Sequence, residues 1–142
     1  AKIGGAEAAR MLGWLQDLVR DPVAFGRTYA ETALPRGCEP PVRAHVAAMA
    51  ASMAPIGFGR ACQMLAGANL SERLKSVHAP LLLLYGDLDP IAPPEAGTLL
   101  DMIVRGTVTE IVEQSGHMPQ LETPEPFHRA LRTFLRAARS RA

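Results

Sequence analysis

The fold of this chain is decided by the stretch LLLLYGDLDPIAPPE, residues 81–95. An apolar run of five residues leads without interruption to a glycine, and it is shorter than an ordinary helix. Such a run is typical of a strand that is buried on both faces of a parallel sheet. The paired prolines that follow favour a helix start, because proline suits the first helical turn. The stretch therefore predicts a strand at 81–85, a polar loop and then a helix.

The C-terminal half of the chain continues this alternation. Residues 107–112 are rich in β-branched side chains and predict a second strand. A last helix is predicted after Pro124, where apolar residues recur at helical spacing. Strand, helix, strand, helix is the order of a doubly wound α/β layer. Two parallel strands do not form a stable sheet alone. Either the predicted helices cover the open sheet edge or another polypeptide supplies the missing strands, and we favour the second possibility.

The first seventy residues have a different character. They are rich in alanine, are interrupted by proline and predict four helices without a strand. The helix that opens at Pro40-Pro41 has an apolar stripe that includes Val42, Val46 and Met49. Large apolar side chains of this region are predicted to pack on each other: Trp14, Phe25, Tyr29, Met49, Met53 and Phe58.

Composition excludes several functional classes. The chain has 142 residues and a formal net charge of +1, which argues against nucleic acid as a partner. No apolar run approaches the roughly 20 residues that span a bilayer, so no membrane association is expected. Only two cysteines are present, and the first residues lack an apolar secretory segment, so we expect a cytoplasmic location. The histidines lack metal-ligand spacing, and neither a metal nor an organic cofactor is predicted.

Polar residues that can take part in catalysis follow each predicted strand. Asp87 and Asp89 come after the first strand, and Ser115-Gly116-His117 comes after the second. In open α/β sheets, catalytic groups gather at the carboxyl ends of strands, so an acid and a histidine there are expected to meet. A carboxylate that accepts a hydrogen bond from Nδ1 fixes the histidine tautomer and leaves Nε2 as a general base.

These two loops resemble those of the α/β-hydrolase superfamily. In residues 81–93 the family's acid is the third residue after the glycine, which corresponds to Asp89. In residues 116–124 a glycine precedes the family's catalytic histidine, which corresponds to His117, and Glu-x-Pro leads into the last helix. Asp87 is interpreted as a turn residue or a group behind the pair. The resemblance covers roughly residues 5–135.

The resemblance implies an α/β fold, namely the C-terminal part of an α/β-hydrolase preceded by an α-helical cap. Residues 1–69 correspond to the cap or lid, and residues 70–142 to the C-terminal part of the core. The family's order is nucleophile, acid, histidine. The sequence contains no Gly-x-Ser-x-Gly motif, so the nucleophile is expected from an N-terminal portion or a second chain.

The resulting hypothesis is serine-type hydrolysis of an ester, lactone or related acyl bond in a small-molecule substrate. His117 would activate the serine and then water, and Asp89 would orient His117. The resemblance also permits peptidase, epoxide hydrolase, dehalogenase or carbon–carbon hydrolase chemistry. The alternatives are a non-catalytic module that binds a ligand or partner, and one half of a nicked enzyme. Glu122 is expected to be structural. Four arginines of the last predicted helix are expected to form a solvated face: Arg129, Arg132, Arg136 and Arg139.

Overall fold

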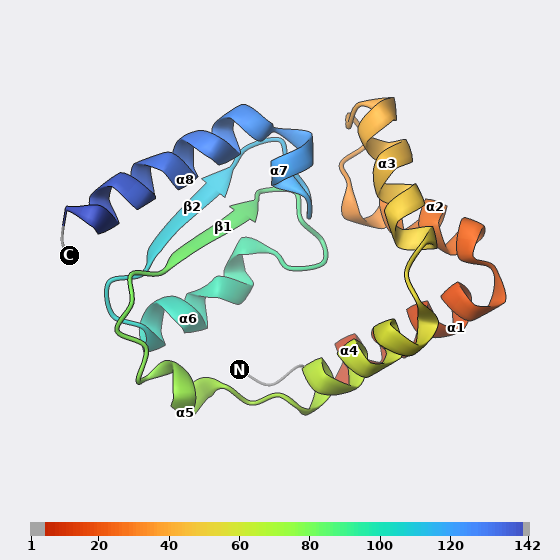
Figure 1. Ribbon diagram of the computed structural model, residues 1–142, viewed down its shortest axis with the longest axis horizontal. Coiled ribbons are helices and arrows are strands. Elements are labelled where there is room, and N and C mark those ends of the chain that lie inside the picture. Colours follow the sequence, from red (N-terminus) through yellow and green to blue (C-terminus); the bar gives the residue numbers. More distant parts are fainter. Residues whose placement is uncertain (1–4, 141–142) are drawn as a thin grey trace. The chain divides into compact units, whose positions relative to one another are not determined.

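A computed structural model describes residues 5–140, with side chains from residue 9 onward except at positions 71, 96 and 99. The first four residues of the predicted cap region lie outside this range. The elements, in chain order, are α1 Gly5–Arg20, α2 Pro22–Ala33, α3 Pro40–Ala51, α4 Pro55–Gly67, α5 Ser71–Leu74, β1 Leu82–Gly86, η1 Pro94–Gly97, α6 Thr98–Ile103, β2 Val108–Val112, α7 Pro119–Glu122 and α8 Pro124–Arg139 (Figure 1). All the predicted helices and strands are present, and the one-turn helices α5 and α7 are additional.

The chain divides into two compact units. The helical unit comprises Ala1–Glu31 and Pro40–Glu72, and the sheet unit comprises Thr32–Glu39 and Arg73–Ala142. The predicted division after residue 69 differs from this in one important respect. Residues 32–39, which were expected in the cap, pack with the sheet unit instead. Because these residues belong to the sheet unit, the end of α2 lies beside the loops that carry the predicted catalytic residues.

Proline sets several helix boundaries. Helices α2, α3, α4 and α8 all begin at a proline, which needs no hydrogen-bond partner for its nitrogen in the first turn. The Asp21 carboxylate accepts hydrogen bonds from the backbone N–H groups of Val23 and Ala24, at 3.1 and 3.0 Å, and so caps α2. None of the described helices is both long enough and apolar enough to cross a membrane.

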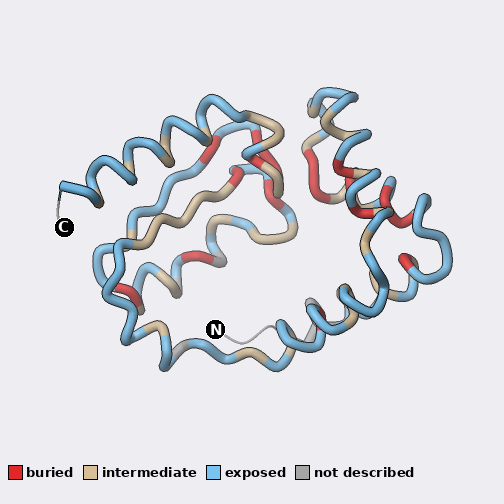
Figure 2. The backbone as a smooth tube through the Cα atoms, viewed as in Figure 1, coloured by how far each residue is buried: buried red, intermediate tan, exposed pale blue. Residues whose placement is uncertain are grey.

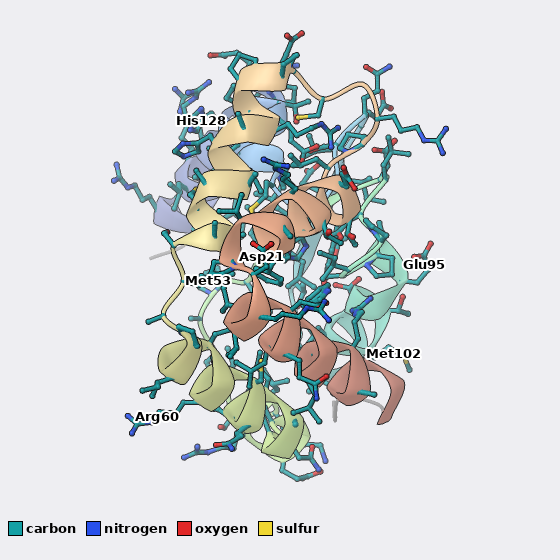
Figure 3. The ribbon with its side chains drawn as sticks, turned by 90° about the vertical axis from the view of Figure 1, so that its right-hand side faces the viewer. Asp21, Met53, Arg60, Glu95, Met102 and His128 are labelled. Carbon is teal, nitrogen blue, oxygen red and sulfur yellow. The ribbon has the colours of Figure 1, made fainter. Side chains whose placement is uncertain are left out.

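The core of the helical unit is aromatic and aliphatic. Leu18, Phe25 and Ala50 are buried, and further side chains pack against them: Trp14, Tyr29, Met53 and Phe58. These packing predictions are confirmed, whereas Met49 is 47% exposed and the prediction that it packs inside was wrong. The end of the stripe on α3 turns outward there, while Val46 is buried. Figure 3 shows Arg60 of α4 pointing away from its helix, consistent with its exposure.

The sheet unit contains two adjacent parallel strands. Their register pairs Leu82 with Val108 and Gly86 with Val112, and η1 and α6 form the crossover. Helix α8 contacts both strands, and Figure 1 shows α6 and α8 on opposite sides of the pair. The Thr109 hydroxyl donates to the Asp101 carboxylate at 2.8 Å, which joins α6 to β2.

The strands are less buried than the sequence predicts. β1 is half-buried and β2 is exposed up to its last residue, Val112 (Figure 2). The prediction of a strand covered on both faces was therefore wrong for the described chain. Each strand has only one strand neighbour among the described residues. The helices η1, α6 and α8 leave part of both strands exposed. Val108 and Ile111 are 38% and 52% exposed and lie on opposite faces of β2, so apolar surface is open on both faces.

Candidate active site

The site lies where the two parallel strands end. β1 ends at Gly86 and β2 at Val112, which are register partners, so the loops that follow leave the same sheet edge. We call residues 87–93 the acid loop and residues 113–118 the histidine loop. Backbone hydrogen bonds join the acid loop to the end of β2 and to the histidine loop: Asp87 N–H donates to the Val112 carbonyl at 3.1 Å, and Leu88 N–H donates to the Ser115 carbonyl at 2.9 Å.

Asp89 and His117 are in direct contact. Nδ1 of His117 lies 2.8 Å from Oδ2 of Asp89, which confirms the predicted meeting of these two side chains. The Asp89 side chain is 6% exposed and that of His117 is 28% exposed. Among the described residues no hydrogen bond occupies Nε2 of His117. Their catalytic roles remain predictions.

The Asp89 carboxylate is oriented by its own loop. Its second oxygen, Oδ1, accepts hydrogen bonds from the backbone N–H groups of Ile91 and Ala92, at 2.8 and 3.0 Å. With His117 on Oδ2, the carboxylate has three donors. A carboxylate in this arrangement keeps a fixed direction, so Oδ2 is available to Nδ1 in a single geometry.

Asp87 has different hydrogen-bond partners from Asp89. Its Oδ1 accepts a hydrogen bond from the Ser115 backbone N–H at 3.1 Å, so it links the acid loop to the histidine loop. The side chain is exposed and is not bonded to His117. This agrees with its interpretation as a group behind the pair.

Glu122 is placed closer to the site than the sequence suggested. Its Oε2 accepts from the Gly116 backbone N–H and its Oε1 from the Met118 backbone N–H, both at 2.8 Å. These are the two neighbours of His117. The available signal was its position at the end of a Pro-x-x-Glu turn, since a Glu in the first turn can reach back to the residue that caps the helix.

The backbone of His117 itself is also held. Its N–H donates to the carbonyl of Ala33, the last residue of α2, at 2.8 Å. No sequence pattern pointed to this contact, because a backbone carbonyl carries no side-chain signature. Ala33 lies in the segment that packs with the sheet unit, so the contact is internal to that unit.

Two glycines permit the loops to approach each other. A Cβ added to Gly86 would collide with the carbonyl oxygens of Ser115 and Gly116. A Cβ added to Gly116 would collide with the carbonyl oxygen of Ala33 and touch the Pro35 ring at 3.0 Å. Glycine is needed at both positions because backbone occupies the space of a side chain.

No described serine is arranged as the nucleophile of this pair. Ser115 is fully buried and its Oγ has no hydrogen-bond partner among the described residues. Among the serines of residues 5–140 whose side chains the structure describes, none is hydrogen-bonded to His117. The other histidines, His45, His78 and His128, are exposed and show no carboxylate partner within that range.

The sheet unit also has two open cavities that do not contain the pair. One, of about 560 Å³, includes His78, Arg105 and Arg139 in its lining and lies at the amino ends of the strands, opposite to Asp89. The other, of about 330 Å³, lies beside the loops and includes Glu122. Asp89 and His117 line neither of these two cavities.

One family of known proteins matches most of this sequence. The sequence model of the Alpha/beta hydrolase family matches residues 2–130. A 72-residue segment is 37% identical to a pimeloyl-(acyl-carrier protein) methyl ester esterase of Salmonella newport, covering 51% of this chain and 28% of that protein. An 81-residue segment is 28% identical to 3-oxoadipate enol-lactonase 1 of Acinetobacter baylyi, covering 57% of this chain and 30% of that protein.

Among solved structures, a thermophilic esterase from Thermogutta terrifontis is similar with a TM-score of 0.83 and 21% identity, over 96% of this chain and 52% of that chain. The chain therefore spans about half of this structure, and the matched segments span less than a third of the two curated relatives.

Proposed function

The chain belongs to the alpha/beta hydrolase family, and we propose that it provides the acid and the histidine of a serine-type hydrolase. The fold predicted from its loops, the C-terminal part of an α/β-hydrolase, is confirmed by the family match and by the similar structures. The proposed reaction is hydrolysis of a carboxylic ester or lactone in a small molecule. The two curated relatives are an ester esterase and an enol-lactonase, which supports this substrate class.

One observation carries the proposal, namely the 2.8 Å contact between Nδ1 of His117 and Oδ2 of Asp89. The carboxylate fixes Nδ1 as the protonated nitrogen, and Nε2 then acts as the base that takes the proton of a serine hydroxyl. As the tetrahedral intermediate collapses to the acyl-enzyme, the same nitrogen gives this proton to the leaving oxygen, and it then takes a proton from the water that hydrolyses the acyl-enzyme. Asp89 stabilises the positive charge that His117 acquires in each step.

The serine is proposed to come from polypeptide outside residues 1–142, either in the same chain or in a second chain. The exposed apolar residues on both faces of β2 support this, because further strands and helices would cover them. The helices of residues 1–69 are proposed to form the cap over the substrate. The proposed location is the cytoplasm; within the described residues no disulfide joins Cys38 and Cys62.

A serine-directed fluorophosphonate probe tests the proposal in the natural polypeptide that contains this chain. Intact mass analysis and peptide mapping should find the label on a serine outside residues 1–142. His117→Ala should abolish labelling, because the serine loses its base. His128→Ala is the matched control and should label normally, since His128 is exposed on α8.

The other outcomes are equally informative. Label on a serine within residues 1–142 would overturn the account of the nucleophile. An absence of label, together with normal ligand binding by Asp89→Asn and His117→Ala, would support the non-catalytic module instead. A label carried by a separate polypeptide that copurifies with this one would identify a second chain or a nicked enzyme.

A further inference from the structure

The histidine loop has three consecutive backbone N–H groups, at residues 116–118, and each has a named acceptor. The Glu122 carboxylate accepts the first and the third, both at 2.8 Å. The Ala33 carbonyl accepts the middle one, also at 2.8 Å. We infer that Glu122 is a positioning residue that holds the backbone on both sides of His117, so that Nδ1 stays directed at Asp89.

The need for such a device follows from the exposure of the histidine. The His117 side chain is 28% exposed, and within the described residues Asp89 provides its only side-chain hydrogen bond. An imidazole with this much freedom can leave its partner by changing rotamer, and the rotamers that are available depend on the backbone. Fixing the backbone at residues 116–118 therefore restricts the direction of the ring.

Glu122 is suited to this position because a carboxylate can accept through both oxygens at once. Hydrogen bonds from backbone N–H groups to an ionised carboxylate are shorter and stronger than neutral ones. Helix α7, Pro119–Glu122, is a single turn. The side chain of its last residue, Glu122, therefore reaches back to the N–H of Met118, the residue that caps the helix. The hydrogen bonds of the Glu122 carboxylate go to the loop backbone and not to the ring or to Asp89, so we infer that it acts through the loop.

Three variants separate positioning from mere stability. Glu122→Ala removes both acceptors. Glu122→Gln keeps one carbonyl oxygen but places an amide N–H₂ against the other backbone N–H, so it keeps about half of the arrangement. Glu125→Gln is the matched control, because Glu125 is an exposed carboxylate at the start of α8 whose nearest partner is Arg132 at 4.0 Å.

The decisive measurement is the NMR signal of the His117 Nδ1 proton, with the ring nitrogens assigned by selective isotope labelling. The natural polypeptide and Glu125→Gln should show a downfield proton that is lost in Asp89→Asn. The signal should weaken in Glu122→Gln and disappear in Glu122→Ala. This readout needs no catalysis, so it tests the inference even if the proposed function fails.

The kinetic arm rests on the proposed function. We expect kcat for an ester substrate to fall by about 100-fold in Glu122→Ala and by about 10-fold in Glu122→Gln, with KM little changed, since a small misplacement of a catalytic group costs about this much. An unchanged Nδ1 signal and rate in a folded Glu122→Ala variant would overturn the inference. Where that variant does not fold, an unchanged signal in Glu122→Gln would overturn it equally.

Discussion

Replacing the acid of the pair gives the sharpest test of the site. In Asp89→Asn, the amide carbonyl oxygen is expected to keep the two backbone donors, Ile91 and Ala92, that now bind Oδ1 at 2.8 and 3.0 Å. The N–H₂ group then faces His117, where Oδ2 now lies. Two donors cannot share a hydrogen bond, so the imidazole moves its proton to Nε2 and ceases to be a base at that atom.

The magnitude follows from the geometry. Two opposite unit charges 2.8 Å apart attract by about 6 kcal/mol at an effective dielectric constant of about 20. The imidazole is 28% exposed, so solvent screens part of this attraction, and we take about 3–6 kcal/mol as the loss of imidazolium stabilisation. At about 1.4 kcal/mol for each factor of ten, kcat/KM should fall by about 10²- to 10⁴-fold.

The assay is hydrolysis of a p-nitrophenyl ester by the natural polypeptide, with the rate of fluorophosphonate labelling as a second readout. Asp87→Asn is the matched control, because it makes the same chemical change two positions earlier. Its amide oxygen can still accept the Ser115 N–H that Asp87 binds at 3.1 Å, so the rate should stay within about twofold. Equal rates for the two variants, at equal thermal stability, would refute the assignment of Asp89 as the acid.

Three further predictions concern stability and reactivity. Gly86→Ala should destabilise the protein to urea by about 1–3 kcal/mol, because its Cβ would meet backbone oxygens; Gly57→Ala, whose Cβ would meet a neighbour only at 4.0 Å, should be neutral or stabilising. Burial, followed by the charge of Asp101, raises the pKa of Tyr85 above 10.0. The unfolded chain therefore releases this proton first, and the unfolding free energy should fall as pH rises past about 10, with a shallower fall in Tyr85→Phe. Burial raises the pKa of Cys62 above 9.0, so iodoacetamide near neutral pH should modify Cys62 only on unfolding. Peptide mapping separates it from the partly exposed Cys38, and rapid modification of Cys62 in the native protein would contradict this.

Much of the architecture was predictable because its signals are local. The prolines at the starts of α2, α3, α4 and α8 mark helix boundaries through the chemistry of a single ring. The run before Gly86 and the β-branched residues before Val112 define the two strands by composition alone. The Asp89–His117 contact then follows from topology, because parallel strands that are register partners deliver their loops to the same edge.

The degree of burial was not predictable in the same way. An apolar strand sequence is typical of a strand that other strands and helices cover on both faces. The described residues provide only part of that cover. Leu82 to Tyr85 are therefore half-buried, and Ile111 is 52% exposed, although the sequence favours complete cover. Likewise, Met49 is 47% exposed, whereas Val46, one turn earlier on α3, is buried.

The glycine of the Gly-His pair connects the predictable part of the site to the unpredictable part. The sequence shows a glycine before His117, and the resemblance to a family gives its place but not its cause. In the structure the Ala33 carbonyl oxygen occupies the space that a side chain at Gly116 would need, and the same oxygen accepts the His117 N–H at 2.8 Å. A side chain at position 116 would push this oxygen away and remove the bond. Glycine there is thus a condition for holding the histidine backbone, and together with the inferred role of Glu122 it accounts for a partly exposed ring that keeps its direction toward Asp89.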